Sequence, residues 1–136
     1  LVLRLHWSGI RILLPGDIET PAEARLAGED CTADVLKVPH HGSRTSSSSA
    51  LLQAVRPAVA VISTGGEHGR EHVDPGVVEG YRRAGIPLWR TDWHGGIVLR
   101  AQNDAVKMIG ERVKRGYPCP PPPDKAPLPP PPGRRI

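Results

Sequence analysis

Two apolar runs in this sequence end in side chains that could bind a metal ion. The run at residues 35–38 is followed by a proline and then by two adjacent histidines, His40 and His41. An earlier run, at residues 10–14, breaks at a Pro-Gly pair and is followed by Asp17. Carboxylate oxygen together with imidazole nitrogen suits a hydrolytic Zn²⁺ or Mn²⁺ site. The two loops therefore predict metal-assisted hydrolysis, although Pro-Gly-Asp is also ordinary turn chemistry.

The histidine pair is followed by small and hydroxylated residues. Adjacent side chains on an extended chain point in opposite directions, so we expect only one of His40 and His41 to face the site. The other histidine would then support the first or contact the substrate. Gly42 permits a close approach of the backbone to a ligand. Ser43 and Thr45 carry hydroxyls suited to a phosphate oxygen, or alternatively to capping the next helix.

Two further histidines lie in loops that follow predicted strands. His72 comes after a glycine-rich, charged segment, where it could act as a general acid, contact a phosphate or be solvated. His94 stands in a turn between Trp93 and Gly95, where a structural role in a hairpin is favoured over catalysis. Of the two, His72 is the candidate for function.

Strands and helices alternate along the chain, which predicts an α/β fold. Apolar runs and period-two patterns predict strands at residues 1–7, 9–14, 34–38, 58–63, 87–91, 97–101 and 105–109. Helices are expected at residues 20–28, 50–55 and 74–85. A capping box between Thr20 and Glu23 would start the first helix, and the serine run at 46–49 would cap the second. The polar candidates follow strands, and α/β folds place their sites at that edge of the sheet.

Composition and charge limit the class of protein. The chain has 136 residues, enough for one domain, and 38% of them are hydrophobic, which is below the usual globular value. The net charge of +4 permits binding to an anionic polymer but does not require it. The sequence has no apolar stretch long enough to span a membrane. We expect a body at residues 1–112 and a disordered, proline-rich tail at residues 113–136.

Several segments together resemble one known family. They are LVLRLHWSGIRILLPGDIE, ADVLKVPHHGSRTSSS, PAVAVIS, EHVDP and GIPLWRTDWHGGIVL, spread over about residues 1–101. This order resembles the carboxyl-terminal metallo-β-lactamase-like domain of ComEC-type DNA internalisation competence proteins. The resemblance implies a four-layer αββα sandwich, of which this chain is the carboxyl-terminal half. It also implies a metal-dependent phosphodiesterase, or nuclease, that degrades one strand of the DNA entering a bacterium.

The resemblance also implies roles for single residues. Asp17 matches a carboxylate that bridges two Zn or Mn ions, and one of His40 and His41 matches a late histidine ligand. Two such ions can activate a water molecule and stabilise an in-line displacement at phosphorus. Asp92 matches a further family position, assigned here as catalytic. His72 matches a catalytic histidine, although its neighbours differ from the family's Gly-His-Pro.

The main ligand run of the family, His-x-Asp-x-Asp-His, is absent from this sequence. We expect it upstream of Leu1, in an amino-terminal half of the same domain, because the chain opens in what reads as the middle of a strand. The expected partners are that half, the membrane channel portion of the same protein, and DNA. The domain would then belong to a bacterial cell membrane protein, on a side of the membrane that the sequence leaves open. Alone, the chain is expected to bind metal weakly and to hydrolyse nothing.

Two other functions fit the same residues. One is a metallo-β-lactamase-like hydrolase of a small phosphodiester or a lactone, since a histidine after a strand serves either substrate. The other is a degenerate, non-catalytic binding module that keeps the fold without the metal. The upstream sequence separates the three: membrane spans favour DNA uptake, and loss of the ligand run favours the binding module.

Overall fold

The computed structural model describes residues 1–65, 73–102 and 105–111. Its strands are β1 (Leu3–Trp7), β2 (Ile10–Leu14), β3 (Val35–Lys37), β4 (Val59–Ile62), β5 (Leu88–Arg90), β6 (Gly96–Gln102) and β7 (Ala105–Glu111). Its helices are α1 (Thr20–Leu26), α2 (Ser49–Val55), α3 (Pro75–Arg83) and α4 (Thr91–His94), and a 3-10 turn covers Pro39–Gly42. The predicted proline-rich tail lies outside the described residues.

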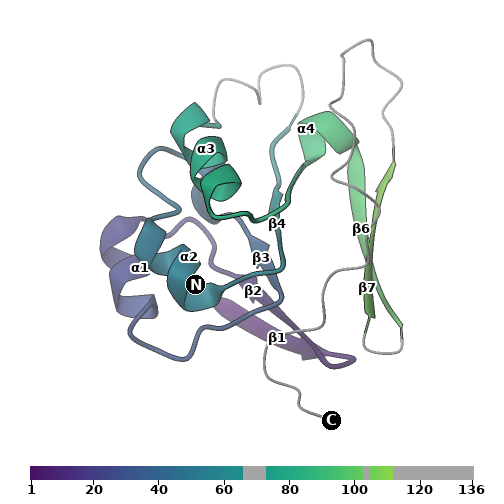
Figure 1. Ribbon diagram of the computed structural model, residues 1–136, viewed down its shortest axis with the longest axis horizontal. Coiled ribbons are helices and arrows are strands. Elements are labelled where there is room, and N and C mark those ends of the chain that lie inside the picture. Colours follow the sequence, from purple (N-terminus) through teal and green to yellow (C-terminus); the bar gives the residue numbers. More distant parts are fainter. Residues whose placement is uncertain (66–72, 103–104, 112–136) are drawn as a thin grey trace.

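Five strands form one sheet in the order β1-β2-β3-β4-β5. β1 runs antiparallel to β2, and the strands from β2 to β5 run parallel to one another. β6 and β7 form a separate antiparallel hairpin that lies beside this sheet (Figure 1). The α/β prediction is confirmed for the described part of the chain, and every predicted strand lies close to its expected bounds. The carboxyl ends of β2 and β3 therefore meet at one edge, as the sequence predicted.

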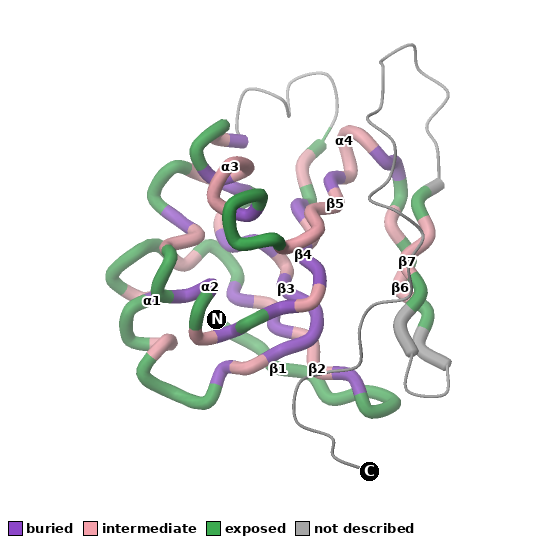
Figure 2. The backbone as a smooth tube through the Cα atoms, viewed as in Figure 1, coloured by how far each residue is buried: buried purple, intermediate pink, exposed green. Residues whose placement is uncertain are grey.

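Helices α1, α2 and α3 pack on one face of the sheet, which we call the helix face (Figure 1). Leu13, Leu36 and Ile62 from the strands are buried there against Leu51 and Tyr81 from the helices. Alternation along the strands places the three strand residues on the same side. Each large apolar side chain buried in this way contributes about 1.5–3 kcal/mol, so this core stabilises the whole arrangement. Figure 2 shows the buried segments running through the sheet strands and the inner sides of the helices.

The opposite face of the sheet, called here the hairpin face, has a smaller core. Ile10, Val35 and Val59 are buried on it, one from each of the neighbouring strands β2, β3 and β4. Leu99 of β6 and Met108 of β7 pack against these residues. The hairpin thus covers the middle of the sheet and holds the second core together.

The outer strand β1 leaves part of the hairpin face open. Leu3, Leu5 and Trp7 are 44%, 45% and 50% exposed and alternate along the strand, so they share one face. Leu5 is paired with Ile12 and Trp7 with Ile10, and these partners belong to the hairpin-face core. The exposed residues therefore extend that core as an uncovered apolar stripe at the edge of the sheet.

The start of α1 differs from the prediction. The predicted capping box is wrong, because Glu19 is the N-cap residue and makes no side-chain cap hydrogen bond. Glu23 is instead fully buried, and its two carboxylate oxygens accept hydrogen bonds from the backbone N–H groups of Ser47 and Ser48 at 2.6 and 2.8 Å. A buried carboxylate needs such donors, and the loop before α2 supplies them.

The other two long helices begin as expected. Ser48, within the serine run, caps α2 by accepting a hydrogen bond from the backbone N–H of Leu51 at 3.3 Å. Asp74 caps α3 by accepting from the backbone N–H of Gly76 at 2.7 Å, with Pro75 at the first helical position. Capping residues next to α2 and α3 in the sequence thus determine where these helices begin. At α1 the predicted cap does not form, because Glu23 binds the distant loop before α2 instead.

Candidate metal centre

The loop that carries the histidine pair has an unusual backbone. His40, His41 and Gly42 all have left-handed φ angles, of 44°, 52° and 82°. The expectation of an extended chain was therefore wrong, because the loop closes into a tight 3-10 turn over Pro39–Gly42. Left-handed geometry costs non-glycine residues about 1–2 kcal/mol each, so the surrounding contacts must hold the turn in place.

Hydrogen bonds from three other segments hold this turn. The backbone N–H of His40 donates to the carbonyl of Gly16, next to Asp17, at 3.0 Å. The Ser46 hydroxyl donates to the Pro39 carbonyl at 3.0 Å, and the backbone N–H of Asp74 donates to the Gly42 carbonyl at 2.9 Å. The first of these contacts ties the histidine loop to the aspartate loop and fixes their spacing.

His41 and Asp17 approach each other across the two loops. The Nε2 atom of His41 lies 3.7 Å from Oδ1 of Asp17. On the other side of the ring, Nδ1 of His41 lies 2.6 Å from the carbonyl oxygen of Ser63, at the end of β4. A carbonyl can only accept, so Nδ1 must carry the proton. When the ring is neutral, Nε2 carries a lone pair, and this nitrogen is the one that lies near the Asp17 carboxylate.

This arrangement suits a metal ion. Backbone carbonyls commonly hold a ligating histidine by its second nitrogen, which fixes both tautomer and ring orientation. Two ligand atoms bound to one tetrahedral Zn²⁺ at its usual bond lengths would be about 3.4 Å apart. The spacing of 3.7 Å between His41 Nε2 and Asp17 Oδ1 is close to this, and both side chains are about half exposed or more, at 52% and 66%. The two residues therefore fit as ligands of one ion.

His40 has a different environment. Its Nδ1 atom lies 3.2 Å from Oε1 of Glu19, but without hydrogen-bond geometry, and this buried nitrogen has no hydrogen-bond partner among the described residues. Glu19 was not predicted as a site residue; the signal for it was the second acid of the Gly-Asp-Ile-Glu stretch. A second histidine–carboxylate contact thus stands beside the first.

The described residues bring together fewer ligating side chains than a metal site uses. Among residues 1–65, 73–102 and 105–111, no three His, Cys, Asp or Glu side chains gather closely enough to hold an ion. Structural and catalytic Zn²⁺ sites use at least three protein ligands. His72, predicted as catalytic, lies outside the described residues.

The predicted substrate hydroxyls lie together in the loop after the histidines. The Ser43 Oγ and Thr45 Oγ1 atoms are 3.2 Å apart, within hydrogen-bond distance. The Thr45 carbonyl accepts hydrogen bonds from the backbone N–H and the hydroxyl of Thr20, both at 2.9 Å. Neither hydroxyl caps α2, which Ser48 does. Their part in substrate binding stays a prediction.

Asp92 is held by an arginine. Arg90 donates to both carboxylate oxygens of Asp92, at 3.0 and 2.6 Å, and the two side chains are only 7% and 4% exposed. The guanidinium of Arg90 also stacks on the ring of Trp93 at 3.9 Å. His94 is 6% exposed at the end of α4, where its Nδ1 faces the backbone of Arg90. The structure thus brings Asp92 into an ion pair rather than into contact with Asp17, and its catalytic role stays a prediction.

Lys37, the last residue of β3, was missed by the sequence reasoning. It interrupts an otherwise apolar run between the fully buried Leu36 and Val38. Burial lowers the pKa of the Lys37 ammonium, while the charge of Asp17 acts in the opposite direction. An ionisable residue inside a buried run is the signal that could have identified it.

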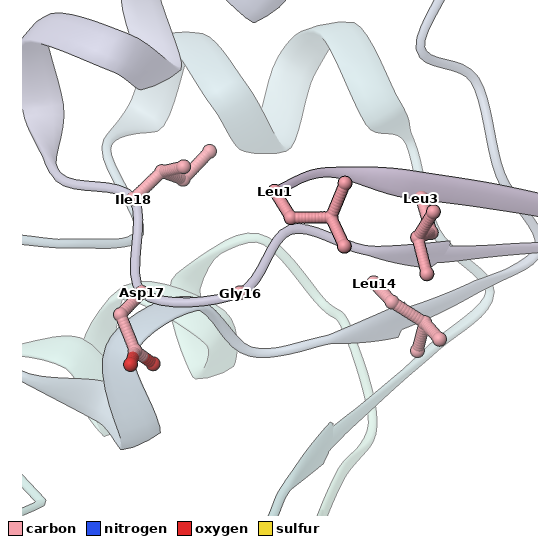
Figure 3. A pocket seen from close by; sticks show the side chains of 6 residues that line it. All are labelled: Leu1, Leu3, Leu14, Gly16, Asp17 and Ile18. Atoms are coloured by element: carbon pink, nitrogen blue, oxygen red, sulfur yellow. The ribbon is translucent and has the colours of Figure 1, made fainter.

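A shallow pocket lies beside Asp17 (Figure 3). Among the described residues that line it, most are apolar and Asp17 has the one charged side chain. These residues are Leu1, Leu3, Leu14, Gly16, Asp17 and Ile18. Gly16 has a φ of 64°, and a Cβ atom there would lie 2.8 Å from the carbonyl oxygen of Leu1. Glycine is therefore required where the chain turns from β2 to Asp17.

Comparison with known proteins places the chain among bacterial competence proteins. No family model matches it. It is 37% identical over 119 residues to "Competence protein ComA" of Neisseria gonorrhoeae, which covers 85% of this chain and 17% of that protein. It is 35% identical over 105 residues to "ComE operon protein 3" of Bacillus subtilis, covering 76% of this chain and 14% of the relative. A shorter match, 52% identical over 54 residues, is to "Recombination protein 2" of Haemophilus influenzae, covering 40% of this chain and 7% of that protein.

These matches define the class of protein. The chain belongs to the ComEC-type competence proteins, over the part of those proteins that it matches. It spans less than a fifth of the length of the curated relatives, 17% of one and 14% of the other. None of the helices in the described part of the chain is long and apolar enough to cross a membrane.

Proposed function

We propose that this chain is part of a metal-dependent phosphodiesterase that degrades one strand of DNA during DNA uptake. The observation that carries the proposal is the approach of His41 Nε2 to Asp17 Oδ1, with Ser63 holding the other side of the imidazole. Membership of the ComEC-type competence proteins, with one relative named "Competence protein ComA", supports a role in DNA uptake. A bacterial membrane protein that includes a channel would then carry this domain.

In this proposal His41 and Asp17 would hold a divalent metal ion, with Asp17 shared between two Zn or Mn ions. Such ions lower the pKa of a bound water molecule and stabilise the charge on a phosphoryl group. The Ser63 carbonyl keeps the proton of His41 on Nδ1 and leaves Nε2 free to bind. Ser43 and Thr45 would donate hydrogen bonds to phosphate oxygens, and His72 would protonate the leaving group. Asp92 would act through Arg90, which it orients.

We also propose that the domain is completed as a four-layer αββα sandwich. The apolar stripe of Leu3, Leu5 and Trp7 on β1 supports this, because an uncovered face of a sheet commonly packs against a second sheet. The missing amino-terminal half of the same domain would cover the stripe and supply the remaining metal ligands. Poor solubility of the isolated chain is the expected consequence.

The decisive experiment uses the protein at the full length of its relatives. Release of nucleotides from a labelled DNA strand is measured with Mn²⁺ or Zn²⁺ and compared between the unaltered protein, Asp17→Ala and His6→Ala. We expect loss of cleavage in Asp17→Ala, because the ligand shared by both ions is removed. His6 is exposed on β1 and serves as the control. Full activity in Asp17→Ala would show the bridging role to be wrong.

Two further measurements separate the alternatives. Cleavage of a small phosphodiester or a lactone in preference to DNA would favour a small-molecule hydrolase, and tight DNA binding without cleavage would favour a binding module. Isothermal titration of the 136-residue chain with Zn²⁺ or Mn²⁺ should show weak binding, because the described part offers too few ligands. Tight binding by the chain alone would contradict this expectation.

A further inference from the structure

We propose that Lys37 binds the substrate, with its ammonium group donating hydrogen bonds to a non-bridging oxygen of the phosphodiester that is cleaved. This inference rests on the proposed function and names a substrate contact within it. The geometry that carries it is the position of Lys37 at the carboxyl end of β3, immediately before the turn that holds His41.

The position of the ammonium follows from the strand. Lys37 is paired with Val61 of β4 and lies two residues after Val35, so it shares the hairpin face with that residue. Its Nζ atom donates to the carbonyl oxygen of Val38 at 2.8 Å. The side chain therefore bends forward along the strand, towards the edge of the sheet where the Asp17 and His41 loops meet.

Lys37 differs from other cations of the molecule in its partners. Arg11 is bonded to Asp34, Arg82 to Glu79 and Arg90 to Asp92, so each of these charges is neutralised by a nearby carboxylate. The described hydrogen bond of Lys37 is to a backbone carbonyl, and an ammonium has three N–H donors. Among the described residues Lys37 forms no ion pair, although the charge of Asp17 acts on it. Two donors of this half-buried cation are thus available to a further acceptor at the metal edge.

The chemistry of phosphodiester cleavage uses such a group. Negative charge is spread over the non-bridging oxygens in the transition state, and catalysis is largely positioning and charge stabilisation. A lysine ammonium is a compact point charge, and partial burial strengthens its attraction to an anion because the local dielectric is low. The burial that lowers the pKa of Lys37 is the same burial that would strengthen this contact.

The competing explanation is structural. A lysine can cover apolar surface with its stem and keep its charge in water, with no role in binding. Lys37→Met tests the two explanations, because methionine keeps the apolar stem and removes the charge. Lys37→Arg returns a cation at nearly the same place. Lys107→Met, at an exposed lysine of β7, is the matched control.

The experiment compares these variants in the full-length protein, with single-stranded DNA and with bis(p-nitrophenyl) phosphate as substrates, and records metal content and melting temperature. We expect Lys37→Met to lower kcat/KM by about 100-fold, the scale seen when one donor to a developing anion is removed. Metal content should stay unchanged, Lys37→Arg should recover part of the activity, and Lys107→Met should match the unaltered protein.

Each contrary outcome has a distinct meaning. Activity of Lys37→Met equal to that of Lys107→Met would overturn the inference, and so would a loss of bound metal, which would make Lys37 a support of the ligands. The melting curve shows whether Lys37→Met folds. If it does not fold, Lys37→Arg is compared with Lys37→Gln, which lacks the charge. Equal substrate affinity of these two variants would then overturn the inference. Absence of DNA cleavage by the unaltered protein would instead refute the proposed function, and full activity of Asp17→Ala would refute the bridging role of Asp17. Inactivity of Asp17→Ala with unchanged Lys37→Met refutes only the role of Lys37.

Discussion

The two ends of the parallel pair β2 and β3 carry similar charged groups arranged in opposite ways. At the amino end, Asp34 precedes β3, and its carboxylate is only 7% exposed. Arg11 of β2 donates to it from the backbone N–H at 2.7 Å and from the guanidinium at 3.0 Å, and also donates to Thr32 at 3.0 Å. Each charge there is matched by a group of the protein itself.

At the carboxyl end, Asp17 is 66% exposed, and its Oδ1 lies 3.7 Å from Nε2 of His41. His40 and Glu19 repeat this pairing of nitrogen and carboxylate beside it. Each contact places an imidazole nitrogen close to a carboxylate oxygen on a partly exposed side chain. The difference indicates a structural role for the amino end, and it agrees with the proposal that the carboxyl end holds a metal site.

Removing His41 should give the largest effect on function. His41→Ala in the full-length protein should lower DNA cleavage by more than the roughly 10–100-fold that is typical of losing an outer partner of a metal site. His40→Ala should have a smaller effect, because none of the described residues accepts or donates a hydrogen bond at its Nδ1 to fix the tautomer. Metal content and cleavage rate are measured together for both variants. A larger loss of metal and activity in His40→Ala than in His41→Ala would make His40, and not His41, the metal ligand.

Removing Asp34 should give the largest effect on stability. Asp34→Ala leaves Arg11 without its carboxylate and should lower the free energy of unfolding by about 3 kcal/mol. Asp17→Ala, at an exposed carboxylate, should change it by less than about 0.5 kcal/mol. Urea unfolding of both variants checks the contrast. Equal losses would mean that the carboxyl end is also structural.

Acid should weaken the amino end selectively. Burial alone would raise the pKa of Asp34, but the hydrogen bonds and charge of Arg11 outweigh it and lower the pKa below its usual 3.8. The pKa of the folded state is thus below that of the unfolded state, so the stabilisation is complete above about pH 4 and is lost as the pH falls through the lowered value. Unfolding curves between pH 2 and 6 should show this loss, and Asp34→Asn should flatten it.

The smallest effect is expected at a surface cluster away from both ends. Hydrogen bonds from Arg82 and Arg83 lower the pKa of Glu79 to about 2 on the exposed side of α3. Solvent screens such pairs, so Glu79→Gln should leave the melting temperature close to that of the unaltered protein. High salt should reduce even this small difference. A loss as large as that of Asp34→Ala would mean that exposed pairs matter as much as buried ones here.

Much of the fold could be predicted because its signals are local. Gly and Pro residues marked the strand ends, apolar alternation gave the strands, and Ser48 and Asp74 gave two helix starts. The meeting of the Asp17 and His41 loops followed from the parallel strands. The left-handed turn could not be predicted, because it depends on donors from Ser46 and Asp74, which lie in other segments.

The burial of Glu23 escaped prediction for the same reason. Its partners, Ser47 and Ser48, lie 24 and 25 residues away, so a capping box that fits the local sequence was displaced by a distant contact. Lys37 was overlooked because residues 35–38 were interpreted as an apolar strand although one of them is charged. In each case the deciding interaction joins parts of the chain that a short window of sequence does not contain together.

The left-handed turn has a consequence for variants chosen from a library. His40 and His41 adopt φ angles of 44° and 52°, which glycine accepts without strain and asparagine more readily than most residues. A screen for heat resistance alone should therefore enrich glycine or asparagine at both positions. A screen for DNA cleavage should keep histidine at position 41. Sequencing the survivors of two such screens would separate, residue by residue, what this turn needs to fold from what it needs to react.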